Sequence, residues 1–155
     1  MNVISSKKPG LIRRFALAFC LCTTLSAAAI VTIMPSQAHA QDAMRTFFDR
    51  GGFNYCDAKL LGAYWGMDVT RAKVEGGQKI LASGNQGISN VKAALQASRG
   101  ARNKCVWGDT QLSYRDAEKL AGYWGTSTPY DAKLKAADFY TNGRPGIVTN
   151  ILASN

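Results

Sequence analysis

Histidine is nearly missing from this chain, and negative charge is scarce. Ten acidic residues stand against nineteen basic ones, which gives a net charge of +9 over 155 residues. The one histidine, His39, lies near the N-terminus, so residues 41–155 contain none. That part of the chain therefore cannot form a Ser-His-Asp triad, a Cys-His nucleophile pair or a zinc site with histidine ligands.

The first 40 residues have the organisation of a secretory signal peptide. Residues 1–14 carry four basic side chains and no acidic one, and residues 15–34 form an unbroken apolar and small-residue run. Ala38-His39-Ala40 places small residues where signal peptidase requires them, so we predict cleavage after Ala40 and export to the periplasm or the medium. The alternative is that the 20 residues 15–34 remain in the membrane as an N-terminal anchor.

Cleavage would leave residues 41–155 with 15 basic and 10 acidic residues, a net charge of +5. This mild positive charge would give a weak attraction to an anionic envelope polymer. An envelope protein is the alternative partner. No run of clustered lysines and arginines follows, so we expect no nucleic-acid partner. We also expect no stable membrane insertion once the signal peptide has been removed.

Two of the four cysteines, Cys20 and Cys22, lie in the predicted signal peptide, which leaves Cys56 and Cys105. Because exported proteins fold in an oxidising compartment, we predict a disulfide bond between them. In the chain-entropy model, closing a loop of about 50 residues stabilises the fold by about 4 kcal/mol. The alternative is two reduced, buried thiols. If the cysteines are paired, no thiolate is left for catalysis or metal binding, and we expect neither a metal nor a cofactor.

The chain contains an internal repeat. Residues 55–66 return as residues 114–125, with seven of the twelve positions identical at an offset of 59 residues. With single-residue insertions and deletions, the similarity extends over a first copy at about 46–101 and a second at about 105–155. Residues 41–155 are therefore predicted to be one domain made of two copies of a single unit.

Each copy has the pattern of three short helices, which predicts an all-α domain of about six helices linked by the disulfide. No alternating β-branched run exceeds four residues, which argues against a sheet. In each copy an N-cap residue precedes the first helix, an aspartate three positions later completes a capping box, and a glycine ends the helix. These residues are Asn54, Asp57 and Gly66 in copy one and Ser113, Asp116 and Gly125 in copy two.

Glycines mark two further features. Gly76-Gly77 lies inside the second helix of copy one, where each glycine costs about 1 kcal/mol of helix propensity relative to alanine. Close packing against the first, aromatic-bearing helix of the copy is therefore expected there. A Gly-x-x-Gly pair precedes the third helix of each copy without the context of a phosphate-binding loop, and it is predicted to form a turn. The two pairs are Gly84 with Gly87 and Gly143 with Gly146.

Paired carboxylates are the remaining catalytic option. Asp57 and Asp116 are the pair to test for glycoside hydrolysis, which needs two carboxyl groups on either side of the scissile bond. Both stand where a capping box requires an aspartate, however, and this structural role explains them without catalysis. We predict no catalytic residue.

The repeated Tyr-Trp-Gly sequences offer a candidate binding surface. Trp65 and Trp124 share a helical stripe with small and apolar residues, so we place them in the core. The neighbouring tyrosines point partly off that stripe and could present aromatic platforms to a sugar or peptide, with a lysine of each copy available for an anionic group. The candidate surface residues are Tyr64 and Lys73 in copy one and Tyr123 and Lys133 in copy two.

Together these observations favour an exported, non-catalytic interaction or binding module of the cell envelope. The first alternative is a carboxylate-dependent enzyme acting on envelope glycans. The second is a structural or stress-protective periplasmic protein without a discrete ligand.

Overall fold

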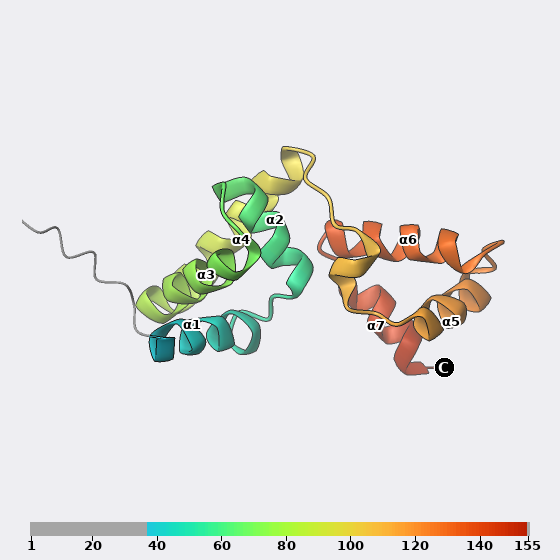
Figure 1. Ribbon diagram of the computed structural model, residues 1–155, viewed down its shortest axis with the longest axis horizontal. Coiled ribbons are helices and arrows are strands. Elements are labelled where there is room, and N and C mark those ends of the chain that lie inside the picture. The colour runs from blue at the N-terminus through green and yellow to red at the C-terminus, as the bar shows by residue number, and fades with distance from the viewer. Residues whose placement is uncertain (1–36, 155) are drawn as a thin grey trace, which may run out of the picture. The chain divides into compact units, whose positions relative to one another are not determined.

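Seven α-helices and one short 3-10 helix make up the computed structural model, which describes residues 37–154 (Figure 1). No strand occurs among these residues, so the predicted all-α class is confirmed. Residues 1–36, which include most of the predicted signal peptide, lie outside the described part. The elements are α1 (Gln37–Asp49), α2 (Tyr55–Trp65), α3 (Val69–Ser83), α4 (Asn85–Gly100), η1 (Trp107–Thr110), α5 (Tyr114–Trp124), α6 (Pro129–Thr141) and α7 (Pro145–Ser154).

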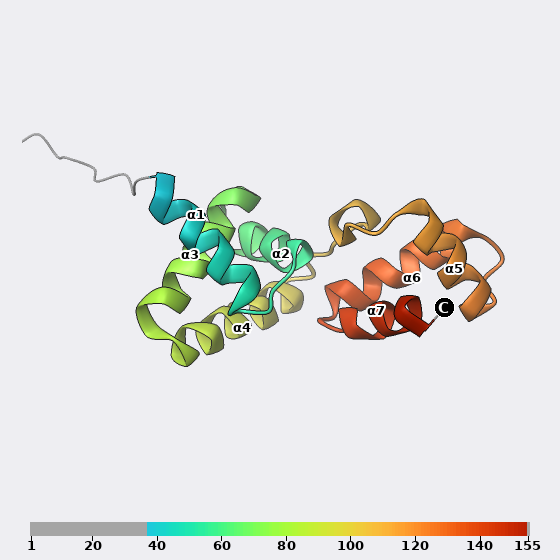
Figure 2. The same cartoon turned by 90° about the horizontal axis from the view of Figure 1, so that it is seen from below.

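Helix α1 is the element that the sequence patterns did not predict. It lies alongside α3 (Figures 1 and 2) and buries Ala43, Thr46 and Phe47. A Cβ atom added to Gly77 would overlap the backbone of Ala43, and one added to Gly76 would overlap the ring of Phe47. The expected close packing at these two glycines is confirmed, but the helix that approaches them is α1.

Helices α2 and α5 have the same length and the same ends. Each spans 11 residues and begins at a capping box, in which the side chain of Asn54 or Ser113 accepts a hydrogen bond from the backbone of the aspartate three residues later. Each ends at a glycine in the left-handed region, with φ of 68° at Gly66 and 60° at Gly125. These local signals fix where both helices start and stop.

The prediction of a turn over each Gly-x-x-Gly pair is only half right. Gly84 and Gly143 do adopt positive φ between helices, at 53° and 70°. Gly87, however, lies buried inside α4, where a Cβ atom would overlap the backbone of α3 at Lys79, and Gly146 lies inside α7. Helix α4 therefore begins at Asn85, earlier than predicted, and its first turn packs directly on the end of α3.

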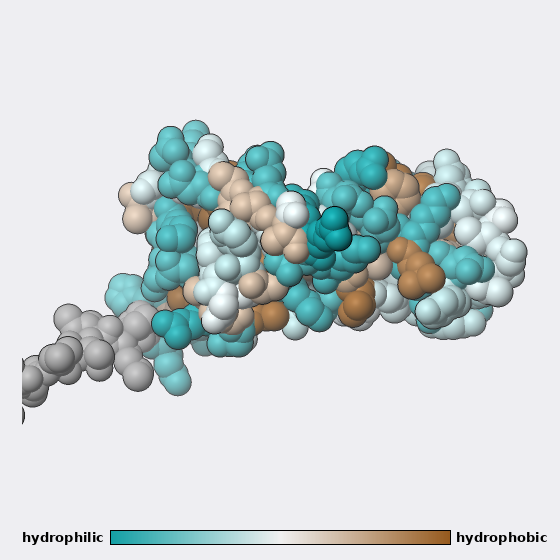
Figure 3. All heavy atoms as spheres, turned by 90° about the horizontal axis from the view of Figure 1, so that it is seen from above, coloured by the Kyte–Doolittle hydropathy of each residue, from teal (hydrophilic) through white to brown (hydrophobic). Residues whose placement is uncertain are grey.

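All seven α-helices contribute buried apolar side chains to one core cluster, which includes Phe47, Leu61, Ile80, Leu120 and Val148. The described residues also form a single unit by their contacts. On the face seen in Figure 3, polar residues predominate and apolar ones appear as separate patches. Within residues 37–154 no helix has the length and apolar character needed to cross a bilayer.

Candidate functional site

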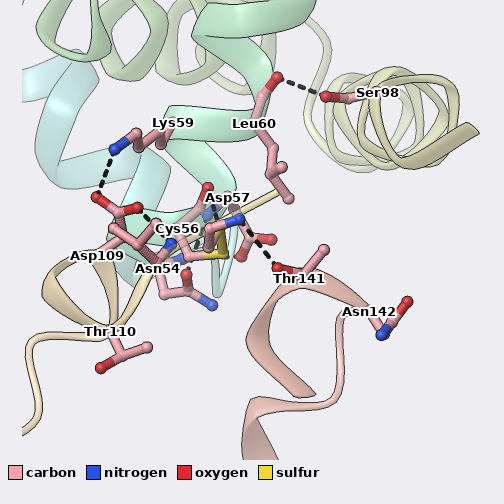
Figure 4. The surroundings of a disulfide bond; sticks show 12 residues. Asn54, Cys56, Asp57, Lys59, Leu60, Ser98, Asp109, Thr110, Thr141 and Asn142 are labelled. Atoms are coloured by element: carbon pink, nitrogen blue, oxygen red, sulfur yellow. Dashed lines mark hydrogen bonds and ion pairs between the residues drawn. A yellow bond between two sulfur atoms is a disulfide. The ribbon is translucent and has the colours of Figure 1, made fainter. Parts of the chain in front are cut away.

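The predicted disulfide is confirmed and lies at the centre of a polar junction (Figure 4). It joins Cys56 of α2 to Cys105, just before η1, with 5.7 Å between their Cα atoms. Both cysteines are buried. The backbone N–H of Cys105 donates to Oγ1 of Thr141 at the end of α6, 3.0 Å away. The bond thus anchors the segment that leads into η1 against α2 and α6.

Two further side-chain contacts hold α2 at this junction (Figure 4). Lys59 of α2 forms an ion pair of 2.9 Å with Asp109 of η1, whose other carboxylate oxygen accepts the N–H of Val106 at 2.8 Å. On the other side, the buried Ser98 of α4 donates to the carbonyl of Leu60 at 2.6 Å. Helix α2 is therefore tied to both η1 and α4.

Arg99 of α4 connects three helices. Its Nη2 atom lies 3.0 Å from Oδ1 of Asp57 in α2, and its Nε atom donates to the carbonyl of Thr141 in α6. The second carboxylate oxygen of Asp57 accepts the N–H of Asn54 at 3.0 Å, as part of the capping box. Both oxygens of this buried carboxylate are therefore engaged.

The two candidate carboxyl groups have opposite surroundings. Burial raises the pKa of Asp57 above its ordinary value of 3.8, although the Asn54 N–H and the Arg99 charge counteract part of this effect. Hydrogen bonds from Ser113 hold the pKa of Asp116 below that value. No ion pair or hydrogen bond connects the two carboxyl groups in the described part of the chain. Burial raises the pKa of the Tyr140 phenol above its ordinary value, and the nearby negative charge of Asp116 adds to this effect.

A pocket of about 340 Å³ opens beside the Asp57–Arg99 pair. It is lined by residues 51–54 and Asp57, by one stripe of α4 (Lys92, Leu95, Gln96 and Arg99), by Gly143 of the α6–α7 connection and by Pro145, the first residue of α7. Arg99 and Asp57 compensate each other, whereas exposed Lys92 makes no ion pair with any residue of the range 37–154. The pocket wall therefore carries one uncompensated positive charge.

The four residues of the predicted binding surface, Tyr64, Lys73, Tyr123 and Lys133, do not line this pocket. Tyr64 and Tyr123 are 47% and 60% exposed. The Nζ atom of Lys73 lies 4.4 Å from the ring centre of Tyr55, and that of Lys133 lies 4.6 Å from the ring centre of Tyr114. Each lysine also faces a second ring, Phe48 for Lys73 and Trp107 for Lys133, at 5.5 and 5.8 Å. Lys73 and Lys133 thus contact aromatic rings, but these are not the rings of Tyr64 and Tyr123.

Trp65 and Trp124, which the sequence pattern places in the core, are half-buried against the core cluster. Trp124 packs on Phe139 of α6, with 5.8 Å between ring centres. A lysine Nζ lies over each indole ring, that of Lys79 at 5.8 Å from the ring centre of Trp65 and that of Lys135 at 4.8 Å from that of Trp124.

Sequence reasoning missed the pocket residues Lys92 and Arg99. The available signal was their spacing of seven residues, which places them on one face of the helix that the structure shows as α4. No group of three or more His, Cys, Asp or Glu side chains suited to a metal ion occurs within residues 37–154. No family model, curated protein or solved structure matches this chain.

Proposed function

We propose that this chain is exported and that its folded part is a non-catalytic binding module of the cell envelope. The observation that carries the proposal is the pocket at the disulfide-linked junction, which has a cationic wall. Its one carboxylate, Asp57, is engaged through both oxygens with Asn54 and Arg99. Such a wall can hold an anionic ligand in place. It presents no carboxyl group free to act as a catalytic acid or nucleophile.

Export with cleavage after Ala40 agrees with the packing of α1. Its buried residues begin at Ala43, and residues 37–39 are exposed, so cleavage leaves the packed part of the helix intact. The disulfide fits the oxidising environment that an exported protein meets. We place the protein in the periplasm or outside the cell.

We further propose that residues 46–101 and 105–155 arose as two copies of one unit. The equal lengths and capping of α2 and α5 support this, as does the placement of Lys73 and Lys133 on rings at matching positions. In this view the duplicated residues maintain the fold. The pocket depends on Lys92 and Arg99, which lie in copy one only.

The test is sedimentation of the purified, disulfide-intact protein with isolated envelope polymers. We expect the protein to sediment with an anionic polymer and to release no soluble fragments from it. Lys92→Ala should weaken this binding, while Lys104→Ala, which removes an exposed lysine outside the pocket, should leave it unchanged. Absence of binding to every polymer would contradict the proposal and favour a structural or stress-protective role.

One observation favours the glycan-hydrolysing alternative. Asp57 lines the pocket and burial raises its pKa, which is the property that a general acid requires. Under that alternative, the wild type would release sugar fragments and Asp57→Asn would abolish the release while the protein stays folded. Asp116→Asn is the matched control, because Asp116 caps α5 in the same way but does not line the pocket. The binding proposal expects no release from any of the three proteins.

A further inference from the structure

We propose that the junction pocket binds a sugar acid, that is, a ligand with one carboxylate carried on a hydroxylated ring. This inference rests on the proposed binding function and specifies the ligand class of the same site. It follows from the charge, the hydrogen-bonding groups and the size of the pocket.

The charge of the pocket wall fits a single negative charge. Arg99 is already paired with Asp57 at 3.0 Å, which leaves Lys92 as the cation free to pair with a ligand. A dianion would bring a second negative charge into a pocket whose wall has no further unpaired cation and already carries the Asp57 carboxylate. A monoanionic carboxylate avoids that repulsion.

The polar groups of the wall fit hydroxyl groups. The side-chain amide of Gln96 provides both donors and an acceptor. Asn54 provides the donors of its side-chain NH2 group, since its Oδ1 accepts the N–H of Asp57 and both Asp57 oxygens are engaged. Hydroxyl groups donate and accept, so they can use such a mixed wall. Sulfate oxygens and the unprotonated oxygens of phosphate only accept hydrogen bonds, and a site for them would consist mainly of donors.

The size and the apolar part of the pocket fit one ring. Its volume of about 340 Å³ is at the lower end of the range of about 300–1,000 Å³ for small-molecule sites. Phe53 and Leu95, both buried, supply apolar surface for the C–H face of a sugar ring, and Pro145 adds to it at the rim.

The test is an NMR titration of the disulfide-intact protein at constant ionic strength with glucuronate, glucose and inorganic phosphate in parallel. We expect glucuronate to shift the amide signals of residues around the pocket and to bind at least several-fold more tightly than the other two. Lys92→Gln should weaken glucuronate binding about tenfold, because it removes a charge-assisted hydrogen bond. Gln96→Leu should also weaken it, while Lys104→Gln should not.

Tighter binding of phosphate than of glucuronate would overturn the inference, as would equal binding of glucose and glucuronate or an unchanged affinity in Lys92→Gln. A glucuronate-containing oligosaccharide added as a further probe distinguishes the source. Tighter binding of the oligosaccharide than of the monosaccharide supports a polymer-borne sugar acid, and equal binding supports a free one. If the protein sediments with envelope polymers but glucuronate causes no shifts, this inference fails while the proposed function stands.

Discussion

Asp57 and Asp116 occupy the same position in two capping boxes, but only Asp57 is also buried and paired with a cation. That cation is Arg99 of α4, which forms an ion pair with Asp57. Burial dominates at Asp57 and raises its pKa, whereas hydrogen bonding from Ser113 dominates at Asp116 and lowers its pKa. The same local motif thus stabilises a helix end at both sites but gives opposite dependences on pH.

We predict opposite pH effects for Asp57→Asn and Asp116→Asn. The raised pKa of Asp57 means that its contribution to stability is fully present below pH 3.8 and is lost as the pH rises through the folded-state pKa. The lowered pKa of Asp116 means that its contribution is present above pH 3.8 and is lost as the pH falls through the folded-state pKa.

Urea unfolding at a series of pH values from 2 to 7 measures both effects, relative to the wild type. The stability of Asp57→Asn should increase relative to the wild type as the pH rises above 3.8. That of Asp116→Asn should decrease relative to the wild type as the pH rises toward 3.8. Differences from the wild type that stay constant over the whole pH range would contradict the assigned pKa shifts.

A second prediction concerns glycine at a helix contact. Gly77→Ala should lower the free energy of unfolding by about 1–3 kcal/mol, because the new methyl group would overlap the Ala43 backbone of α1. Gly122→Ala is the control, since Gly122 lies in α5 with nothing near its missing Cβ. It should raise stability by up to about 1 kcal/mol through helix propensity. Thermal and urea unfolding check the signs, and equal effects of both substitutions would show that α1 does not pack on Gly77.

At the scale of elements, the parts that the sequence predicted are those defined over a few residues. Asn54 and Asp57 are three residues apart, so the start of α2 could be read directly from the pattern, and the glycine at its end is equally local. Gly76-Gly77 indicated a close contact, but nothing local showed which helix makes it. Helix α1 was missed because its N-terminal residues overlap the predicted cleavage site.

Helix α1 should contribute strongly to stability through Phe47. This side chain is fully buried against Gly76 and stacks with Phe53 at 5.1 Å between ring centres. Phe47→Ala should lower the free energy of unfolding by about 3–5 kcal/mol, the usual cost of removing a buried aromatic ring. The adjacent Phe48 is only half-buried, so Phe48→Ala should cost clearly less. Urea unfolding measures both losses of unfolding free energy. Similar losses in the two variants would contradict the burial of Phe47 between α1 and α3.

At the scale of the whole molecule, the candidate site depends on contacts between segments far apart in the sequence. Arg99 lies 42 residues from both Asp57 and Thr141, and it lies outside the strongly repeated block of residues 55–66. The disulfide could be predicted because the compartment argument left only two cysteines. The pocket could not, since its walls come from residues 51–54, from α2 and α4, and from the α6–α7 connection with the start of α7. Their meeting point is a property of the tertiary structure.

The disulfide should therefore matter for both stability and the pocket. Cys56→Ala with Cys105→Ala should lower the free energy of unfolding by about 4 kcal/mol, since 49 residues separate the two cysteines. Lys59→Ala, which removes the partly exposed ion pair to Asp109, should cost only about 0–1 kcal/mol. Urea unfolding measures both losses, with circular dichroism to verify that the helices remain.

Because Arg99 and Thr141 lie beside the bond, the double alanine variant should also lose affinity for a pocket ligand under conditions where it is still folded. Lys59→Ala should keep that affinity, since Lys59 does not line the pocket. If the double variant were destabilised but bound the ligand with unchanged affinity, the disulfide would stabilise the fold without shaping the pocket.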